Sequence, residues 1–130
     1  MLLRKEFTFD AAHNLVRYHG KCEALHGHTY RLAVVLEGTP DAEGMILDFC
    51  ELSAAVRERV VSRLDHTYIN DIIPQPTAEN ISQWIWDQIE APLSRSNCRL
   101  HEVWLWETAT SCVVLSASDR TGRMGDRGQP

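Results

Sequence analysis

Two kinds of hydrophobic periodicity follow one another along this chain, and their order constrains the fold more than any other feature. Alternation of apolar and polar residues, or a β-rich run, is typical of strands, and such runs cover residues 5–10, 29–37, 100–107 and 112–117. Between the second and third of these runs, apolar residues recur twice at helical spacing. The order is strand, strand, helix, helix, strand, strand. Because neighbouring strand pairs favour antiparallel hairpins over parallel βαβ units, we expect an α+β fold: an antiparallel four-stranded sheet with two helices on one face.

Capping residues mark where the two predicted helices begin. Asp48, followed three residues later by Glu51, resembles a helix-starting pair with Asp in place of Ser or Thr. This pattern predicts a helix over residues 49–64. Thr77 can cap the second helix, which we expect to end near Pro92.

The length and composition predict a single globular domain. The chain has 130 residues, of which 44% are hydrophobic and 24% charged, and these values are ordinary for one folded core. The predicted strands and helices lie within residues 1–117, which we expect to form the domain. Residues 118–130 contain three Gly and three Arg and no large aliphatic side chain, so we expect a disordered tail.

The charge balance disfavours a nucleic-acid-binding protein. The chain carries 13 Lys and Arg against 18 Asp and Glu, a net charge of −5, whereas binding to phosphates requires a basic surface. No segment approaches the roughly 20 continuous apolar residues that span a bilayer, and the N-terminus is charged where an export signal would be apolar. We therefore expect a cytoplasmic protein that binds neither nucleic acid nor membrane.

The predicted sheet also has two exposed edges. An unpaired edge offers its backbone N–H and C=O groups to other strands, and proteins usually cover or close such edges. Pairing with further copies of the chain would close them. We therefore expect a homo-oligomer.

The four cysteines show no CxxC spacing, so they indicate no metal or redox motif of that type. Cys50 and Cys112 lie in apolar runs, and we expect them to be core thiols. Cys98 has no evident role. Cys22 differs from the others because two histidines follow it closely.

The densest group of reactive side chains is the segment Cys22-Glu-Ala-Leu-His26-Gly-His28. His26 and His28 are two residues apart at the start of a strand, so their imidazoles project from the same face. His13 follows the first strand, and hairpin pairing of the first two strands would bring it near this pair. Three neutral imidazoles can hold a zinc ion and leave one coordination position open, as in catalytic sites.

The spacing alone leaves three alternatives open for these residues. They can form a catalytic zinc site, a closed structural zinc site with Cys22 as the fourth ligand, or a set of histidines that binds no metal. Removing the metal distinguishes the first two, because a structural site unfolds with its zinc and a catalytic site keeps its fold.

Two further candidates, the Asp65-His66 pair and Glu107, are ambiguous from their local sequence. A carboxylate beside an imidazole can hold its tautomer and support a proton relay, but the same pair can simply end a helix and start a turn. Glu107 continues an apolar strand face, where a carboxylate needs an ion pair or a ligand with N–H donors. It can also reach solvent at the strand end. On local sequence alone, the structural interpretation is favoured for both candidates.

Taken together, these residues resemble the 6-pyruvoyl-tetrahydropterin synthase superfamily over about residues 3–117. The matching motifs, in chain order, are Phe7-Thr-Phe9-Asp-Ala-Ala-His13, Cys22-x-x-x-His26-Gly-His28, Leu47-Asp48-Phe49, Leu64-Asp65-His66, Pro76-Thr77-Ala78-Glu79-Asn80, Trp84-Ile85-Trp86 and Glu107-Thr108. The three-residue gap between Cys22 and His26 is similar to that of the branch that makes 6-carboxytetrahydropterin in the queuosine pathway. The branch that makes 6-pyruvoyl-tetrahydropterin typically has a longer gap.

The resemblance implies a fold, an assembly and a role for each candidate residue. The fold is the T-fold, whose subunits join their sheets into a barrel and usually form a homohexamer with active sites at subunit interfaces. The implied roles are zinc ligand for His13, His26 and His28, base for Cys22, relay from a neighbouring subunit for Asp65 and His66, and pterin anchor, sometimes counted in the relay, for Glu107.

The resemblance also implies an activity. The expected enzyme is a lyase that uses zinc and no redox cofactor to convert 7,8-dihydroneopterin triphosphate to 6-carboxy-5,6,7,8-tetrahydropterin, acetaldehyde and triphosphate. The alternative within the superfamily is loss of triphosphate without carbon–carbon cleavage, which gives 6-pyruvoyl-tetrahydropterin. A third possibility, from another class, is a zinc-stabilised binding module without turnover. Product analysis separates the three.

Overall fold

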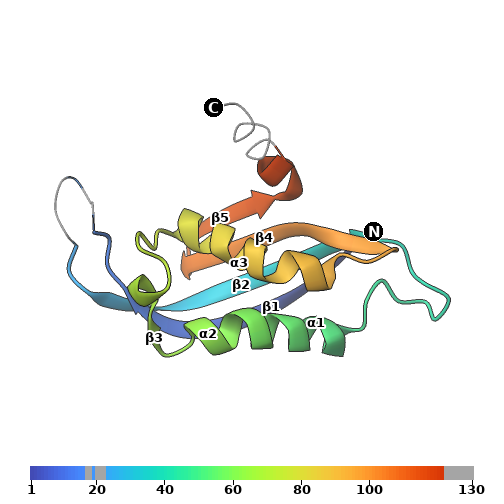
Figure 1. The fold of residues 1–130 in the computed structure, drawn as a ribbon, viewed down its shortest axis with the longest axis horizontal. Helices are drawn as coiled ribbons and strands as arrows, with labels where there is room; N and C mark the ends of the chain where they lie inside the picture. Colours follow the sequence, from blue (N-terminus) through green and yellow to red (C-terminus); the bar gives the residue numbers. More distant parts are fainter. Residues whose placement is uncertain (17–18, 20–22, 122–130) are drawn as a thin grey trace.

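A computed structural model describes residues 1–16, 19 and 23–121 of the chain, and a five-stranded sheet is its central element (Figure 1). The strands are β1 (Leu2–His13), β2 (His26–Gly38), β3 (Thr67–Tyr68), β4 (Cys98–Thr108) and β5 (Ser111–Ser116), in the sheet order β3-β1-β2-β4-β5. The β1–β2, β2–β4 and β4–β5 pairs are all antiparallel. The predicted four-stranded antiparallel sheet is therefore confirmed.

A fifth strand, β3, which the sequence pattern does not indicate, lies beside β1. Its two residues pair in parallel with Ala11 and Ala12. The backbone N–H of His66 donates to the carbonyl of Asp10 (2.6 Å) just before this pairing begins. Two residues are too few for an alternating pattern to be read, which explains why the sequence predicts only a polar loop there.

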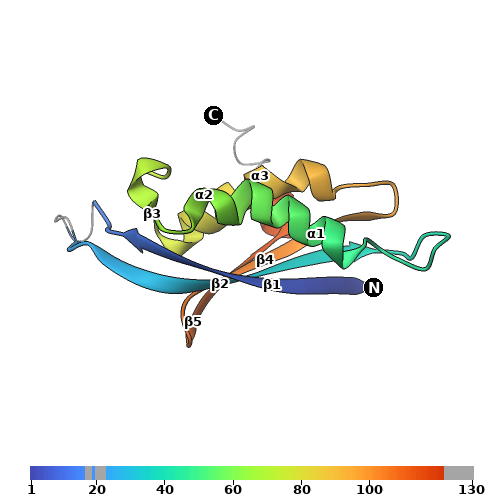
Figure 2. The same cartoon turned by 90° about the horizontal axis from the view of Figure 1, so that it is seen from below.

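Two helical segments cover one face of the sheet (Figure 2). The first is continuous and comprises α1 (Phe49–Val56), the π-helical η1 (Arg57–Val61) and α2 (Ser62–Leu64). The second is α3 (Ala78–Leu93), and a short 3-10 turn, η2 (Ile69–Asp71), precedes it. Among the described helices, none is long and apolar enough to cross a membrane.

Both predicted helix starts are confirmed by their caps. A carboxylate oxygen of Asp48 accepts a hydrogen bond from the backbone N–H of Cys50 (2.7 Å), and the hydroxyl of Thr77 accepts one from the N–H of Asn80 (3.1 Å). Such side chains satisfy N–H groups that have no partner inside the helix. The caps fix where each helix starts and so where the preceding loop ends.

The hydrophobic core lies between the helices and the face of the sheet that they cover. Buried residues of this core on the first two strands are Phe7, Phe9, Ala11, Tyr30, Leu32, Val34 and Leu36. They alternate along each strand, as one face of a sheet requires. The helices contribute Leu52, Val56, Val60, Leu64, Ile81, Ile85, Trp86 and Ile89.

The cysteine predictions are wrong. Cys50 and Cys112 are exposed, whereas Cys98 is buried. Cys50 lies on the outward side of α1, because Leu52 takes the core position of that turn. Cys112 pairs with Trp106 on the sheet. An apolar run therefore does not by itself specify which of its members face the core.

Residues 118–121 also differ from the expected disordered tail. Residues 117–121 form a helical turn. A carboxylate oxygen of Asp119 accepts from the backbone N–H of Ser116 (3.0 Å), and Arg120 pairs with Asp87 of α3. Residues 122–130, the rest of the predicted tail, lie outside the described residues.

Candidate functional site

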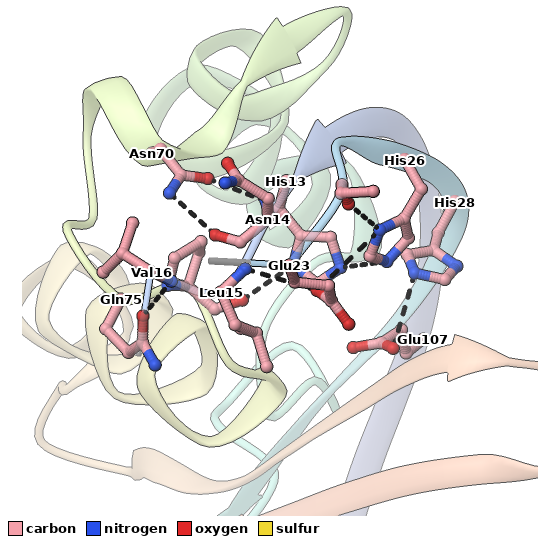
Figure 3. Close-up of polar contacts among 12 residues, drawn as sticks. His13, Asn14, Leu15, Val16, Glu23, His26, His28, Asn70, Gln75 and Glu107 are labelled. Carbon is pink, nitrogen blue, oxygen red and sulfur yellow. Dashed lines mark hydrogen bonds and ion pairs between the residues drawn. The ribbon is translucent and has the colours of Figure 1, made fainter. Parts of the chain in front are cut away.

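Three histidines converge at the end of the sheet where β1 finishes and β2 begins (Figure 3). His13 lies directly opposite His26 in the antiparallel register, and His28 follows two residues along β2. Because alternate residues of a strand share a face, all three project from the same face as Phe9 and Tyr30. One nitrogen of each ring lies within 4.8 Å of those of the other two. The structure thus brings together the three residues singled out in the sequence.

Backbone carbonyls fix the tautomers of two of these imidazoles. His13 Nδ1 lies 2.8 Å from the carbonyl oxygen of Pro76, and His26 Nδ1 lies 2.9 Å from that of Ala24. A carbonyl can only accept a hydrogen bond, so each Nδ1 carries the proton and donates it. In the neutral ring, Nε2 then carries the free lone pair, which is the tautomer that binds a metal ion through Nε2.

The two free nitrogens face each other. His13 Nε2 and His26 Nε2 lie 3.1 Å apart, and two lone pairs at this separation repel unless a cation or a proton lies between them. Two imidazole ligands of a tetrahedral zinc ion, each about 2.0–2.1 Å from the metal, have nitrogens roughly 3.3 Å apart. The observed spacing therefore fits a shared metal ion, with His28 as the third ligand.

His28 has a different environment from the other two. Its Nε2 is buried and makes no hydrogen bond with any described residue, although Glu107 Oε1 lies 3.4 Å away. Burial lowers the pKa of His28; Glu107 opposes this effect, and His13 and His26 add to it. The lowered pKa favours the neutral imidazole near pH 7, which is the form that can bind a metal.

Glu107 comes from the end of β4 and faces the histidine cluster (Figure 3). It follows the buried Val103 and Leu105 at alternate positions, and its side chain is 31% exposed. It does not simply reach solvent at a strand end, because His28 is beside it. A carboxylate can accept more than one hydrogen bond, so Glu107 can also bind a ligand that carries neighbouring N–H groups.

A network of amide side chains holds the chain that follows His13. Asn70 accepts from the backbone N–H of Asn14 (3.1 Å) and donates to its carbonyl (2.8 Å). Gln75 accepts from the backbone N–H of Val16 (2.8 Å). No pattern in the sequence marks Asn70 and Gln75 as site residues, because they lie 56 and 59 residues further along the chain than their partners.

Asp65 and His66 form a separate cluster with Asp10. The backbone N–H of Asp10 donates to Asp65 Oδ1 (2.9 Å), and Asp65 Oδ2 lies 2.9 Å from His66 Nδ1. The Asp10 N–H, and then His66, lower the pKa of Asp65. The carboxylate is therefore ionised near neutral pH and can hold the Nδ1–H of the imidazole. This geometry matches a carboxylate that orients a histidine.

His66 itself is held in an unusual conformation. Its φ is 57°, in the left-handed region that non-glycine residues seldom adopt, and its side chain is 79% exposed. An open hollow of about 610 Å³ is lined by both His66 and His28. Even so, the described structure contains no hydrogen bond or ion pair that joins the Asp65-His66 pair to the three histidines. Within one chain, the Asp65-His66 pair therefore lies at the border of the site and has no direct polar link to the three histidines among the described residues.

Cys22, the predicted base, lies outside the described residues. Its neighbour in the sequence, Glu23, is described. The Glu23 N–H donates to the carbonyl of Leu15 (2.8 Å), and Glu23 Oε1 lies 3.8 Å from His26 Nδ1. The chain is therefore anchored beside the histidine cluster at the residue that follows Cys22.

One protein family and several named proteins are similar to this chain. The family described as 6-pyruvoyl tetrahydropterin synthase matches residues 2–118. The chain is 39% identical over 119 residues to a 6-carboxy-5,6,7,8-tetrahydropterin synthase from Synechocystis sp., across 86% of this chain and 90% of that protein. It is 42% identical over 100 residues to a dihydroneopterin monophosphate aldolase from Pyrococcus furiosus, across 77% of this chain and 83% of that protein.

The fold has a close counterpart among solved structures. The structure of 6-pyruvoyl tetrahydropterin synthase from Caenorhabditis elegans superimposes with a TM-score of 0.78 at 24% sequence identity. The superposition covers 90% of this chain and 95% of that one. The two chains therefore share a fold over nearly their whole length.

Proposed function

The chain belongs to the 6-pyruvoyl tetrahydropterin synthase family, and on this premise we propose that it converts 7,8-dihydroneopterin triphosphate and water to 6-carboxy-5,6,7,8-tetrahydropterin, acetaldehyde and triphosphate. The observation that carries the proposal is the cluster of three histidines beside Glu107, with the two facing Nε2 atoms 3.1 Å apart. The name of the Synechocystis relative supports this reaction over others of the family. Through the resemblance to that branch, the product belongs to queuosine biosynthesis.

We assign a zinc ion to His13, His26 and His28. Support comes from the carbonyl groups that leave the Nε2 lone pairs of His13 and His26 free. Further support comes from the buried Nε2 of His28, which has no hydrogen-bond partner among the described residues. Three neutral imidazoles are a ligand set of catalytic zinc, which keeps one position open. When bound, zinc would supply a Lewis acid that polarises a hydroxyl oxygen of the substrate side chain.

Cys22 is assigned the role of the base that removes a proton from the substrate side chain. The thiolate is the form that acts, and positive charge nearby favours it. Support comes from the spacing to His26 and His28 in the sequence and from the anchoring of Glu23 beside His26. The proton that Cys22 removes must move on, which requires a second group with an exchangeable proton.

Asp65 and His66 are assigned to that task in a neighbouring subunit. His66 is held through Nδ1 by Asp65 (2.9 Å), and most of its side chain is exposed. The sheet offers edges for assembly: residues 2–10 of β1 precede its pairing with β3, and β5 has a partner on one side in the described sheet. Joining such edges closes a sheet into a barrel. We propose a hexamer in which each site takes His66 from another copy.

Glu107 is assigned to the pterin ring, and replacing it with glutamine is expected to weaken substrate binding. The carboxylate can accept two parallel N–H bonds from the amino-pyrimidinone edge, whereas an amide replaces one acceptor with a donor. We expect KM to rise roughly tenfold to a hundredfold, the effect of one or two lost charge-assisted bonds. Steady-state kinetics with dihydroneopterin triphosphate measures this change.

Glu102→Gln is the matched control for Glu107→Gln. Glu102 lies on the same strand, and its carboxylate accepts from Trp104 Nε1 (2.9 Å). Among the described residues, it makes no hydrogen bond or ion pair with His13, His26 or His28. A similar rise in KM for both variants would argue against a specific role of Glu107 in pterin binding.

The reaction itself is tested by mass spectrometry of products formed from dihydroneopterin triphosphate by zinc-loaded and metal-stripped protein. We expect 6-carboxytetrahydropterin and acetaldehyde in equal amounts from the zinc-loaded protein alone. Accumulation of 6-pyruvoyl-tetrahydropterin without acetaldehyde would instead assign the alternative reaction of the family. Dihydroneopterin monophosphate, supplied in a parallel reaction, tests the activity named for the Pyrococcus relative. If neither substrate reacts, the result would indicate that the protein is a binding module without turnover.

A further inference from the structure

Tyr30 lies at the boundary between the hydrophobic core and the histidine cluster. It is on the core face of β2 and is fully buried, with 0% of its surface exposed. Its ring stacks on Phe9, with ring centroids 5.1 Å apart and planes at 13°. The same ring also meets His13 and His28 edge-on, at centroid distances of 5.9 and 5.5 Å. Tyr30 therefore connects the packing of the core to two of the imidazoles.

The hydroxyl of Tyr30 is buried and has no hydrogen-bond partner among the described residues. Buried hydroxyls normally find a partner, because an unpaired one has lost its hydrogen bonds to water without replacement. A phenylalanine would stack on Phe9 equally well and would leave no polar atom unpaired. Packing alone therefore does not explain why this position carries a tyrosine. A hydrogen-bond partner that moves into place when a ligand binds would explain it.

Glu107 is the carboxylate of the site that shares a neighbour, His28, with Tyr30. A tyrosine hydroxyl is protonated near neutral pH, so it can donate a hydrogen bond to an anionic acceptor. Glu107 also lies 3.4 Å from His28 Nε2 without a hydrogen bond between the two. The Tyr30 ring meets the His28 ring edge-on, with centroids 5.5 Å apart, so Tyr30 and Glu107 are both neighbours of His28.

We propose that Tyr30 is a positioning residue for Glu107: when a pterin occupies the site, the Tyr30 hydroxyl donates a hydrogen bond to the Glu107 carboxylate and holds it in the orientation that binds the pterin N–H groups. This inference rests on the proposed role of Glu107 in pterin binding. An ionised carboxylate has about four acceptor positions, so it can accept from Tyr30 and from the pterin together. The bond supplies a partner for the hydroxyl that the described structure leaves unpaired.

A double-mutant cycle of Tyr30→Phe and Glu107→Gln tests the proposal. The affinity for pterin is measured with zinc-loaded protein by the change in pterin fluorescence on binding. Tyr30→Phe is expected to weaken pterin binding about tenfold, the effect of one lost hydrogen bond to a charged group. In the Glu107→Gln background the same substitution is expected to have little further effect, because the acceptor is already altered.

Zinc content and melting temperature are measured on the same variants. We expect Tyr30→Phe to bind zinc as the unaltered protein does. We also expect it to melt at the same or a higher temperature, because it removes a buried hydroxyl that has no partner in the part of the chain that the structure describes. A clear fall in melting temperature would assign the hydroxyl a structural role and overturn the proposal. Unchanged pterin affinity, or equal losses in both backgrounds, would overturn it too.

The cycle also separates this inference from the proposed function. Unaltered protein that binds pterin but leaves dihydroneopterin triphosphate unchanged would contradict the proposed reaction, while the coupling between Tyr30 and Glu107 could still be found. Normal turnover without coupling would contradict the positioning role alone. Absence of pterin binding by the unaltered protein would overturn both.

Discussion

Replacement of His26 by alanine is expected to leave the chain folded, remove its zinc and abolish turnover. His26 lies at the open end of β2 and is partly exposed, whereas the core residues that stabilise the sheet lie further along the strand. Two imidazoles remain, which is one ligand fewer than catalytic zinc sites use. We expect zinc to fall from about one ion per chain to near zero, because the three-ligand site is lost.

The expected loss of activity follows from what the metal does. A metal that polarises a substrate oxygen supplies several kcal/mol of transition-state stabilisation, and each 1.4 kcal/mol is a factor of ten in rate. We therefore expect kcat/KM to fall at least about a thousandfold. Elemental analysis gives the zinc content, circular dichroism gives the fold, and steady-state kinetics gives the activity of the same preparation.

His101→Ala is the matched control for His26→Ala. It also removes one imidazole, but His101 lies outside the cluster of three, with its Nδ1 3.9 Å from Glu37 Oε2. We expect this variant to keep its zinc and its turnover. Full zinc occupancy and normal activity in His26→Ala would contradict the assigned ligand set.

Metal removal from the unaltered protein separates a catalytic from a structural site. We expect chelated protein to keep its secondary structure, to melt at a lower temperature because it has lost a ligand of the native state, and to regain activity when zinc is restored. Unfolding on chelation would instead indicate a structural site, in which Cys22 is a fourth ligand. The core between helices and sheet supports the first outcome, because it is extensive and does not depend on the histidines.

The convergence of the three histidines could be predicted from the sequence because it depends on strand geometry. The two-residue spacing of His26 and His28 places them on one face, and the antiparallel register places His13 opposite His26. The groups that orient the rings could not be predicted in this way. The carbonyl of Pro76 reaches His13 from 63 residues along the chain, and backbone groups carry no signal in the side-chain pattern.

Local sequence could not decide between the interpretations of Glu107 and Asp65-His66, because each depends on contacts made by other segments. Glu107 gains its place beside His28 from the pairing of β4 with β2. The position of the Asp65 carboxylate depends on its hydrogen bond from the backbone N–H of Asp10. This N–H lies beside Asp65 because β3 pairs with the next residues of β1, Ala11 and Ala12. β3 itself is too short for any periodicity to be read.

Co-expression of Cys22→Ala and His66→Ala chains is expected to restore activity that neither variant has alone. If each site takes Cys22 from one chain and His66 from a neighbour, both homo-oligomers lack one proton-transfer group in every site. We expect each to be slower by on the order of a hundredfold or more, the typical contribution of a general acid or base. In mixed oligomers, some sites pair an intact Cys22 with an intact His66.

The size of the recovery can be stated in advance, which makes the experiment decisive. With equal amounts of the two chains and random assembly, roughly a quarter of the sites in a symmetric homo-oligomer receive both intact residues. Co-expression of Cys22→Ala with His26→Ala is the control, because each site takes Cys22 and His26 from the same chain. Every chain in this mixture lacks one of the two residues, so no site has both. Chains that carry different affinity tags, purified in sequence, ensure that only mixed oligomers are assayed. Recovery in the control pair, or none in the Cys22→Ala and His66→Ala pair, would contradict a site shared between subunits, and His66 would then act within its own chain or not at all.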